Sequence, residues 1–270
     1  MACALSGATA LMTGVCSGQT TAADYATNPT YGGGWSAGQN GGYGFGAWSF
    51  DGTDATPAGT YQGMSSSAPI GTSWTLMSHS SSSGLANAGR SITGGLLPGQ
   101  TFETVIENPS AYTVGQYQGG YRGWDILFTG GPDNNGPGNN TAALRLQVFD
   151  YFNPAQNWTG KDTANFNISL TGPTTAAQGV RIDLTLTSAT AYSLTMTPLN
   201  GATPFLHSGT LAGPISWVDY RLYNAASGGV NDTAQNFEIS QMTISTVPEP
   251  SALALIGLGS AGLLFLRRRK

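Results

Sequence analysis

The sequence predicts an all-β fold, an antiparallel β-sandwich, for residues 24–246. Two segments, 164–170 and 180–186, alternate apolar and polar residues without a fault, which places one face of a strand in the core and the other in solvent. Pairs such as Gly172-Pro173 and Asn200-Gly201 favour turns between strands. Because no segment of this region has the helical period of about 3.6 residues, the strands should pair antiparallel without helical crossovers, as a jelly roll of the concanavalin type.

The expected strands follow one another from residue 102 to residue 244. Several carry aromatic side chains on both faces, which is typical of strands at the centre of a sheet. Ser80–Ser83 and residues 133–140 are expected as surface loops, and no second domain or internal repeat is evident. The expected strands are 102–106, 124–128, 144–152, 164–170, 180–186, 192–197, 215–223 and 237–244.

The charge balance argues against a nucleic-acid-binding protein. Charged residues make up 9% of the chain, and its formal net charge is −4. Four of the ten basic residues are the last four of the chain, so residues 24–246 hold six basic against thirteen acidic residues. An acidic surface without basic stripes offers nothing that binds a phosphate backbone.

Residues 1–23 are similar to a secretory signal peptide. Ala2–Val15 is small and apolar, and Thr21-Ala22-Ala23 provides a small-residue cleavage site before Asp24. No Lys or Arg precedes the apolar run, so either the true start lies upstream or the signal is weak. Cys3 and Cys16 are the two cysteines of the chain, so neither disulfides nor thiol chemistry is expected after removal of this segment.

The last 24 residues consist of a proline-rich acidic motif, an uncharged apolar segment and a basic cluster. A helix over the apolar segment would be about 22 Å long, short of the roughly 30 Å hydrocarbon core of a bilayer, so flanking residues must help it to span. The basic cluster places that end in the cytoplasm, and the prolines keep the motif extended at the outer surface. The motif is Val247, Pro248, Glu249 and Pro250, the apolar segment is 252–266, and the cluster is Arg267, Arg268, Arg269 and Lys270.

This order of motif, helix and basic cluster resembles the PEP-CTERM protein-sorting tail of bacterial envelope proteins. The resemblance implies a partner, an exosortase, which is an integral-membrane cysteine enzyme that recognises the motif, removes the helix and passes the ectodomain outward. It implies a transient stay in the inner membrane and then a place at the cell surface or in the extracellular matrix. A permanent single-pass anchor is the alternative.

A second resemblance concerns the predicted sandwich. Gly34-Trp35, residues 40–48, residues 86–90 and residues 97–102 look like an ectodomain type that recurs among proteins with this tail. Its motifs are glycines and aromatic residues, which specify a fold better than a function. The resemblance therefore implies no catalytic residue.

Apparent catalytic motifs in the chain lack the context that they need. Ser36 lies in a G-x-S-x-G sequence, but residues 39–42 after it are a poor helix start, and a nucleophile elbow needs a helix there. His79 and His207 are the two histidines, too few for a three-histidine zinc site. Glu103 and Glu107 are about 13 Å apart along a strand, beyond either glycosidase separation. We therefore expect no enzyme activity.

Two further site hypotheses stay open at this level. Glu103 or Glu107 can still pair with an acid on another strand, such as Asp125 or Asp183. The oxygen-rich turns 51–54 and 133–135 are candidates for calcium, although neither matches a defined calcium loop and ordinary Asx turns also explain them. No other cofactor is expected.

Aromatic residues among glycines carry the remaining functional signal. Trp35, Tyr43, Trp48 and Trp124 are candidates for stacking on sugar rings, and packing in a sandwich core explains them more economically. We expect an exported surface or matrix protein with a structural or adhesive role. The alternatives are a carbohydrate-binding module for exopolysaccharide and a polysaccharide hydrolase or lyase.

Overall fold

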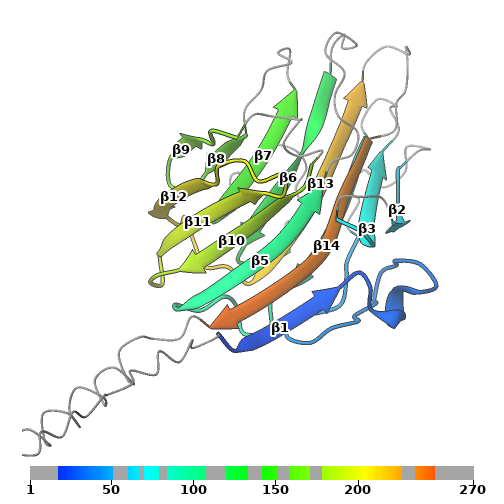
Figure 1. The fold of residues 1–270 in the computed structure, drawn as a ribbon, viewed down its shortest axis with the longest axis horizontal. Coiled ribbons are helices and arrows are strands. Elements are labelled where there is room, and N and C mark those ends of the chain that lie inside the picture. The colour runs from blue at the N-terminus through cyan, green and yellow to red at the C-terminus, as the bar shows by residue number, and fades with distance from the viewer. Residues whose placement is uncertain are drawn as a thin grey trace, which may run out of the picture.

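The computed structural model describes residues 18–50, 60–66, 70–78, 84–107, 120–132, 142–150, 158–170, 178–226 and 235–246. These residues form two antiparallel sheets that pack face to face, and Figure 1 shows the larger sheet in front of β13, β6 and β7. The predicted all-β antiparallel sandwich is confirmed.

The larger sheet has eight strands, in the order β12-β11-β10-β5-β14-β3-β2, and β1 also pairs with β14. The long strand β14 has β5 along one edge, whereas its other edge pairs first with β3 and then with β1. The bounds are β1 Thr20–Tyr25, β2 Thr60–Ser65, β3 Ser73–Ser78, β5 Gln100–Glu107, β10 Val180–Leu186, β11 Ala191–Pro198, β12 Phe205–Thr210 and β14 Gln235–Thr246.

The smaller sheet has six strands, in the order β4-β13-β6-β7-β8-β9. A single turn of 3-10 helix, η1 at Pro29–Tyr31, is the one helical element of the described residues. The bounds are β4 Gly84–Ser91, β6 Gly120–Thr129, β7 Leu144–Asp150, β8 Thr159–Lys161, β9 Asn165–Asn167 and β13 Trp217–Ala226.

The sandwich begins before the boundary expected at Asp24. Residues Thr20–Ala23 form the first part of β1, where Ala22 and Ala23 are buried against β14. A cleavage before Asp24 would divide this strand, and the cleavage position stays a prediction.

The structure contains strands rich in small residues that the sequence analysis does not predict. Strand β4, for example, reads Gly-Leu-Ala-Asn-Ala-Gly-Arg-Ser, and neither glycine nor alanine favours a strand. It is held by a full register of partners on β13, from Ser91 opposite Trp217 to Gly84 opposite Asn224. The expected strand 164–170 is shorter than predicted, because β9 is an edge strand that pairs with β8 over only Asn165–Asn167.

Aromatic rings join the two sheets across the core. Trp124 of β6 stacks on Phe237 of β14 with ring centroids 4.9 Å apart. Phe102 of β5 meets Phe128 of β6 edge to face at 5.3 Å. All four are 0% exposed, so these contacts lie inside the close-packed interior, where aromatic pairs add to the burial of apolar surface.

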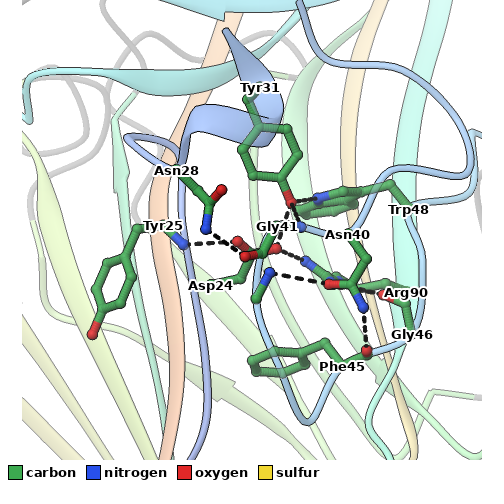
Figure 2. A network of polar contacts seen from close by, with 11 residues as sticks. Asp24, Tyr25, Asn28, Tyr31, Asn40, Gly41, Phe45, Gly46, Trp48 and Arg90 are labelled. Atoms are coloured by element: carbon green, nitrogen blue, oxygen red, sulfur yellow. Dashed lines mark hydrogen bonds and ion pairs between the residues drawn. The ribbon is translucent and has the colours of Figure 1, made fainter.

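A buried ion pair connects the N-terminal strand of one sheet to the edge of the other (Figure 2). Arg90 Nη1 of β4 lies 2.5 Å from Asp24 Oδ2 of β1, and both side chains are 0% exposed. The guanidinium also donates to the Gly46 carbonyl oxygen and to Asn40 Oδ1, at 2.6 and 2.7 Å from Nη2. Tyr31 donates its hydroxyl proton to Asp24 Oδ2, and burial together with this bond raises the pKa of Tyr31 to about 12.

The glycines of the 40–48 segment allow its backbone to approach β1 closely. A Cβ on Gly42 would lie 1.9 Å from the Ala23 carbonyl oxygen. Gly44 has φ +76°, and a Cβ there would lie 2.3 Å from Ala22 Cβ. The glycine and aromatic motif therefore serves to build the shell around Arg90.

We predict that Asp24→Asn lowers the free energy of unfolding by about 3–5 kcal/mol, because loss of one partner leaves the buried Arg90 uncompensated. Urea unfolding of the full chain, followed by tryptophan fluorescence, measures the change. Asp183→Asn is the control, since its pair with Arg181 has side chains 21% and 46% exposed and should contribute less than about 1 kcal/mol. Equal losses in the two variants would contradict this role of the buried pair.

Candidate functional site

Three of the four aromatic residues proposed for glycan stacking belong to the core. Trp35, Trp48 and Trp124 are 3%, 2% and 0% exposed, whereas Tyr43 is 55% exposed. Trp35 packs edge to face on Trp48 at 4.9 Å, so their rings already face other rings. The stacking hypothesis is wrong for these three tryptophans, because a buried ring has no face for a sugar.

The other candidate residues with described positions do not assemble into one site. Ser36 lies in a turn in which its backbone N–H donates to Gln39 Oε1 at 2.8 Å, and no helix begins between residues 37 and 50. His207 of β12 stacks on Phe166 of β9 at 3.9 Å, a contact between edge strands of the two sheets. Glu103 faces Asp183 across β5 and β10.

Several predicted features lie outside the described residues. These are His79, the turns 51–54 and 133–135, the sorting motif Val247–Pro250, the apolar segment 252–266 and the cluster Arg267–Lys270. Within the described ranges, no helix is long and apolar enough to span a membrane. The same ranges contain no group of three or more His, Cys, Asp or Glu residues arranged to hold a metal ion.

The outer side of the six-stranded sheet carries a concentration of polar side chains. Along β13, Val218, Tyr220 and Leu222 enter the core, so the alternating residues Trp217, Asp219, Arg221 and Tyr223 point to the outer side. The neighbouring strands contribute polar residues at the matching positions. We call this surface the polar face, and its residues are Asn87, Asp125, Arg145, Gln147, Thr159, Lys161, Asn165, Asn167, Trp217, Asp219, Arg221 and Tyr223.

The strand register arranges the polar face in two rows that cross the sheet. Within a row, each residue lies beside its register partner on the neighbouring strand, and neighbouring strands are about 4.8 Å apart. The first row is Asn87, Arg221, Asp125, Gln147, Thr159 and Asn167, and the second is Gly89, Asp219, Leu127, Arg145, Lys161 and Asn165.

Ion pairs fix the middle of the polar face. Arg145 Nη2 lies 2.7 Å from Asp125 Oδ2, and Tyr223 donates its hydroxyl proton to the same oxygen at 3.3 Å. Arg221 Nη2 lies 3.8 Å from Asp219 Oδ2. Burial raises the pKa of Asp125, and the arginines oppose that shift. Each aspartate of this region therefore lies beside an arginine that compensates its charge.

Three oxygen acceptors of the first row are buried and lack a hydrogen-bond partner. Asn87 Oδ1, Asp125 Oδ1 and Gln147 Oε1 have no hydrogen-bond partner among the described residues. A polar atom that is shielded from water and has no partner is costly. The face becomes more open toward β9, where Asn165 and Asn167 are exposed. The arrangement can accept and donate hydrogen bonds along a line that crosses the sheet.

The sequence analysis missed the polar face, although part of its signal was present. The period of two in residues 217–223 separates Trp217, Asp219, Arg221 and Tyr223 from the apolar set. Asn87, Gln147 and Asn165 carry no such signal, because only the register shows that they share a face with β13.

Comparison with known proteins identifies the tail and gives remote structural likenesses. Residues 246–270 match the family model of the PEP-CTERM protein-sorting motif. No curated protein matches the chain.

Three solved structures illustrate the structural likenesses. A chain from a study of endo-acting O-glycanases of the human gut microbiota has TM-score 0.48 and 8% identity, covering 84% of this chain and 99% of its own. A protein of unknown function from Shewanella oneidensis MR-1 has TM-score 0.47 and 10% identity, covering 85% and 88%. The calcium-bound exoplasmic/lumenal domain of VIP36 has TM-score 0.43 and 9% identity, covering 76% and 85%. At these values none of them bears on function.

The sorting tail is thus confirmed by its family model, and such a motif implies export by membrane-associated sorting. The chain is a two-sheet antiparallel β-sandwich that ends in a PEP-CTERM protein-sorting motif.

Proposed function

We propose that this protein is an exported, non-catalytic surface protein that binds extracellular polysaccharide through the polar face. The structural or adhesive role and the carbohydrate-binding alternative are then one activity, because binding to the matrix polymer is what makes the protein adhesive. The sorting motif supports the location, and the polar face supports the ligand class.

The observation that carries the proposal is the pair of polar rows across six strands. A polysaccharide presents hydroxyl groups at regular intervals, and each hydroxyl both donates and accepts. The exposed amides of Asn165 and Asn167, with the half-buried side chains of Gln147 and Thr159 beside them, offer donors and acceptors to such a chain at the β7–β9 end of the rows. A surface of this kind suits an extended polar chain better than a compact apolar ligand.

Trp217 is the side chain that we assign to sugar stacking. It is half-buried on the polar face, and its Nε1 donates to Asp219 Oδ1 at 3.0 Å. A Cβ on Gly89 would lie 2.6 Å from that nitrogen, so the glycine makes room for the indole on β4. An indole held in one orientation loses little rotamer freedom when a sugar ring packs on it.

A polysaccharide hydrolase on the same face is the rival function. Asp219 is paired with Leu127, two residues from Asp125, and such diagonal neighbours are about 7–8 Å apart. Burial raises the pKa of Asp125, as a general acid requires. Against this function, Asp125 and Asp219 each lie beside an arginine, an arrangement suited to a fixed ion-pair network.

Sorting completes the proposal. An exosortase in the inner membrane recognises Val247–Pro250, cuts before or near the apolar segment and releases the sandwich to the cell surface or matrix. Strand β14 ends at Thr246, directly before the motif, so the cleavage would leave the sheet intact.

We predict that Trp217→Ala weakens binding to exopolysaccharide from the host bacterium by about three- to tenfold, the loss expected when one aromatic contact is removed. Combining it with Gln147→Ala should weaken binding further. Affinity electrophoresis of the full chain in gels that contain the polysaccharide measures the change. Tyr25→Ala is the matched control, because Tyr25 is 44% exposed on the other sheet, and equal retardation of all variants would exclude the polar face.

We predict that the protein releases no reducing ends from the polysaccharide that it binds. The rate should equal that of the Asp125→Asn variant and of the buffer blank, because the carboxylates serve the ion-pair network. Turnover that disappears in Asp125→Asn while binding persists would establish the hydrolase instead.

We predict that simultaneous Pro248→Ala, Glu249→Ala and Pro250→Ala holds the chain in the membrane at full length. In a host that has the sorting enzyme, the wild-type protein should lose the apolar segment and the basic cluster. The reason is that the prolines keep the motif extended, the conformation in which a protease binds its substrate. Mass spectrometry of the C-terminal peptide decides between the two. Intact Arg267–Lys270 on wild-type protein at the cell surface would mean a permanent anchor.

A further inference from the structure

Two glutamates face each other on the outer side of the eight-stranded sheet. Glu107 ends β5 and is the register partner of Glu238 on β14, and each is 1% exposed. The neighbouring residues Ile106, Phe237 and Ile239 belong to the core, so both carboxyl groups point away from it. This pair lies on the other sheet from the polar face and takes no part in the proposed polysaccharide binding.

Oxygen atoms from a third strand extend this pair. Thr75 of β3 is the register partner of Glu238, and Ser73, two residues before it, donates its hydroxyl proton to Glu238 Oε2 at 2.8 Å. Ser73 and Thr75 are 0% and 3% exposed. Three adjacent strands thus bring two carboxyl groups and two hydroxyl groups together in a buried position.

Two of these oxygens have no hydrogen-bond partner among the described residues. They are Thr75 Oγ1 and Glu107 Oε2, and both are buried. The charged side chains of the neighbouring β10, Arg181 and Asp183, pair with each other at 3.1 Å. Burial and the charge of Glu238 raise the pKa of Glu107 to about 7. Two buried like charges need a proton or a cation between them.

We propose that Glu107, Glu238, Thr75 and Ser73 form a calcium site that joins β5, β14 and β3. Calcium is a hard cation that takes six to eight oxygen ligands, and it accepts carboxylates and neutral oxygens together. The four side chains carry six oxygens. Thr75 Oγ1 and Glu107 Oε2 lack a partner, whereas Glu238 accepts from Ser73 and Glu107 also accepts from the Ile70 backbone N–H. Calcium sites in extracellular modules have dissociation constants of roughly 0.1–1 mM.

The test is the melting temperature of the full chain in mild detergent, after dialysis against chelator, with and without 2 mM calcium chloride. At pH 8 calcium should raise the melting temperature by about 3–5 °C. This is the shift expected for a domain of this size when the calcium concentration is about ten times the dissociation constant of one site. Magnesium chloride at the same concentration is the control for ionic strength. A melting temperature that calcium does not change at pH 8 would overturn the proposal.

Glu107→Gln separates the calcium site from a simple proton-sharing pair. Its amide resembles the protonated carboxyl group, so the variant should fold, melt with less dependence on pH and lose the calcium shift. Glu103→Gln is the matched control on the same face of β5 and should keep the shift. Thr75→Val removes one neutral oxygen and should raise the calcium concentration for half of the shift at least threefold.

Two results would show that the glutamates hold only a proton. The first is a wild-type melting temperature that does not respond to calcium. The second is a calcium shift that persists in Glu107→Gln. Either result overturns the site and leaves the polysaccharide-binding proposal untouched, because that binding is measured on the other sheet.

Discussion

The pairing of Asp24 with Arg90 is the constraint on which the arrangement of the two sheets depends. The two residues come from β1 and β4, which belong to different sheets, and they meet at 2.5 Å with no exposed surface. Arg90 also lies over the rings of Trp48 and Phe45, at 4.7 and 5.1 Å. A buried guanidinium needs all these partners, so the segment around Gly42 must fold over it and close this side of the sandwich.

The aromatic residues around Arg90 pack in the core, and other aromatic residues lie on the outer side of the six-stranded sheet. Trp48 lies against Arg90 and packs on Trp35 and Trp74, and Trp74 meets Tyr31 edge to face. Trp124 packs between the sheets. The interior is therefore filled by the residues that first suggested a glycan site. The ligand recognition that we propose therefore falls to the outer side of the six-stranded sheet, where alternation along β13 places a different set of polar and aromatic side chains.

The sequence predicts the strands that alternate strictly, and less of what depends on pairing. Val180–Leu186 agrees with β10 at both ends, because burial of one face imposes a period of two. The sequence of β4 is too rich in glycine and alanine to indicate a strand. The strand forms because it pairs with β13 along its length. The rows of the polar face require the register of six strands. The meeting of Glu107 with Glu238 further depends on the irregular register between Ile239 and Gln241, which no local pattern indicates.

Hydrogen exchange on the bound protein tests the central claim most directly, because it locates the ligand without any substitution. Adding exopolysaccharide from the host bacterium should slow the exchange of backbone amides in β7, β8, β9 and β13, which surround the polar rows. The eight-stranded sheet should exchange as it does in the free protein. Protection confined to the eight-stranded sheet, or to the segment around Tyr43, would contradict the assignment of the polar face as the binding surface.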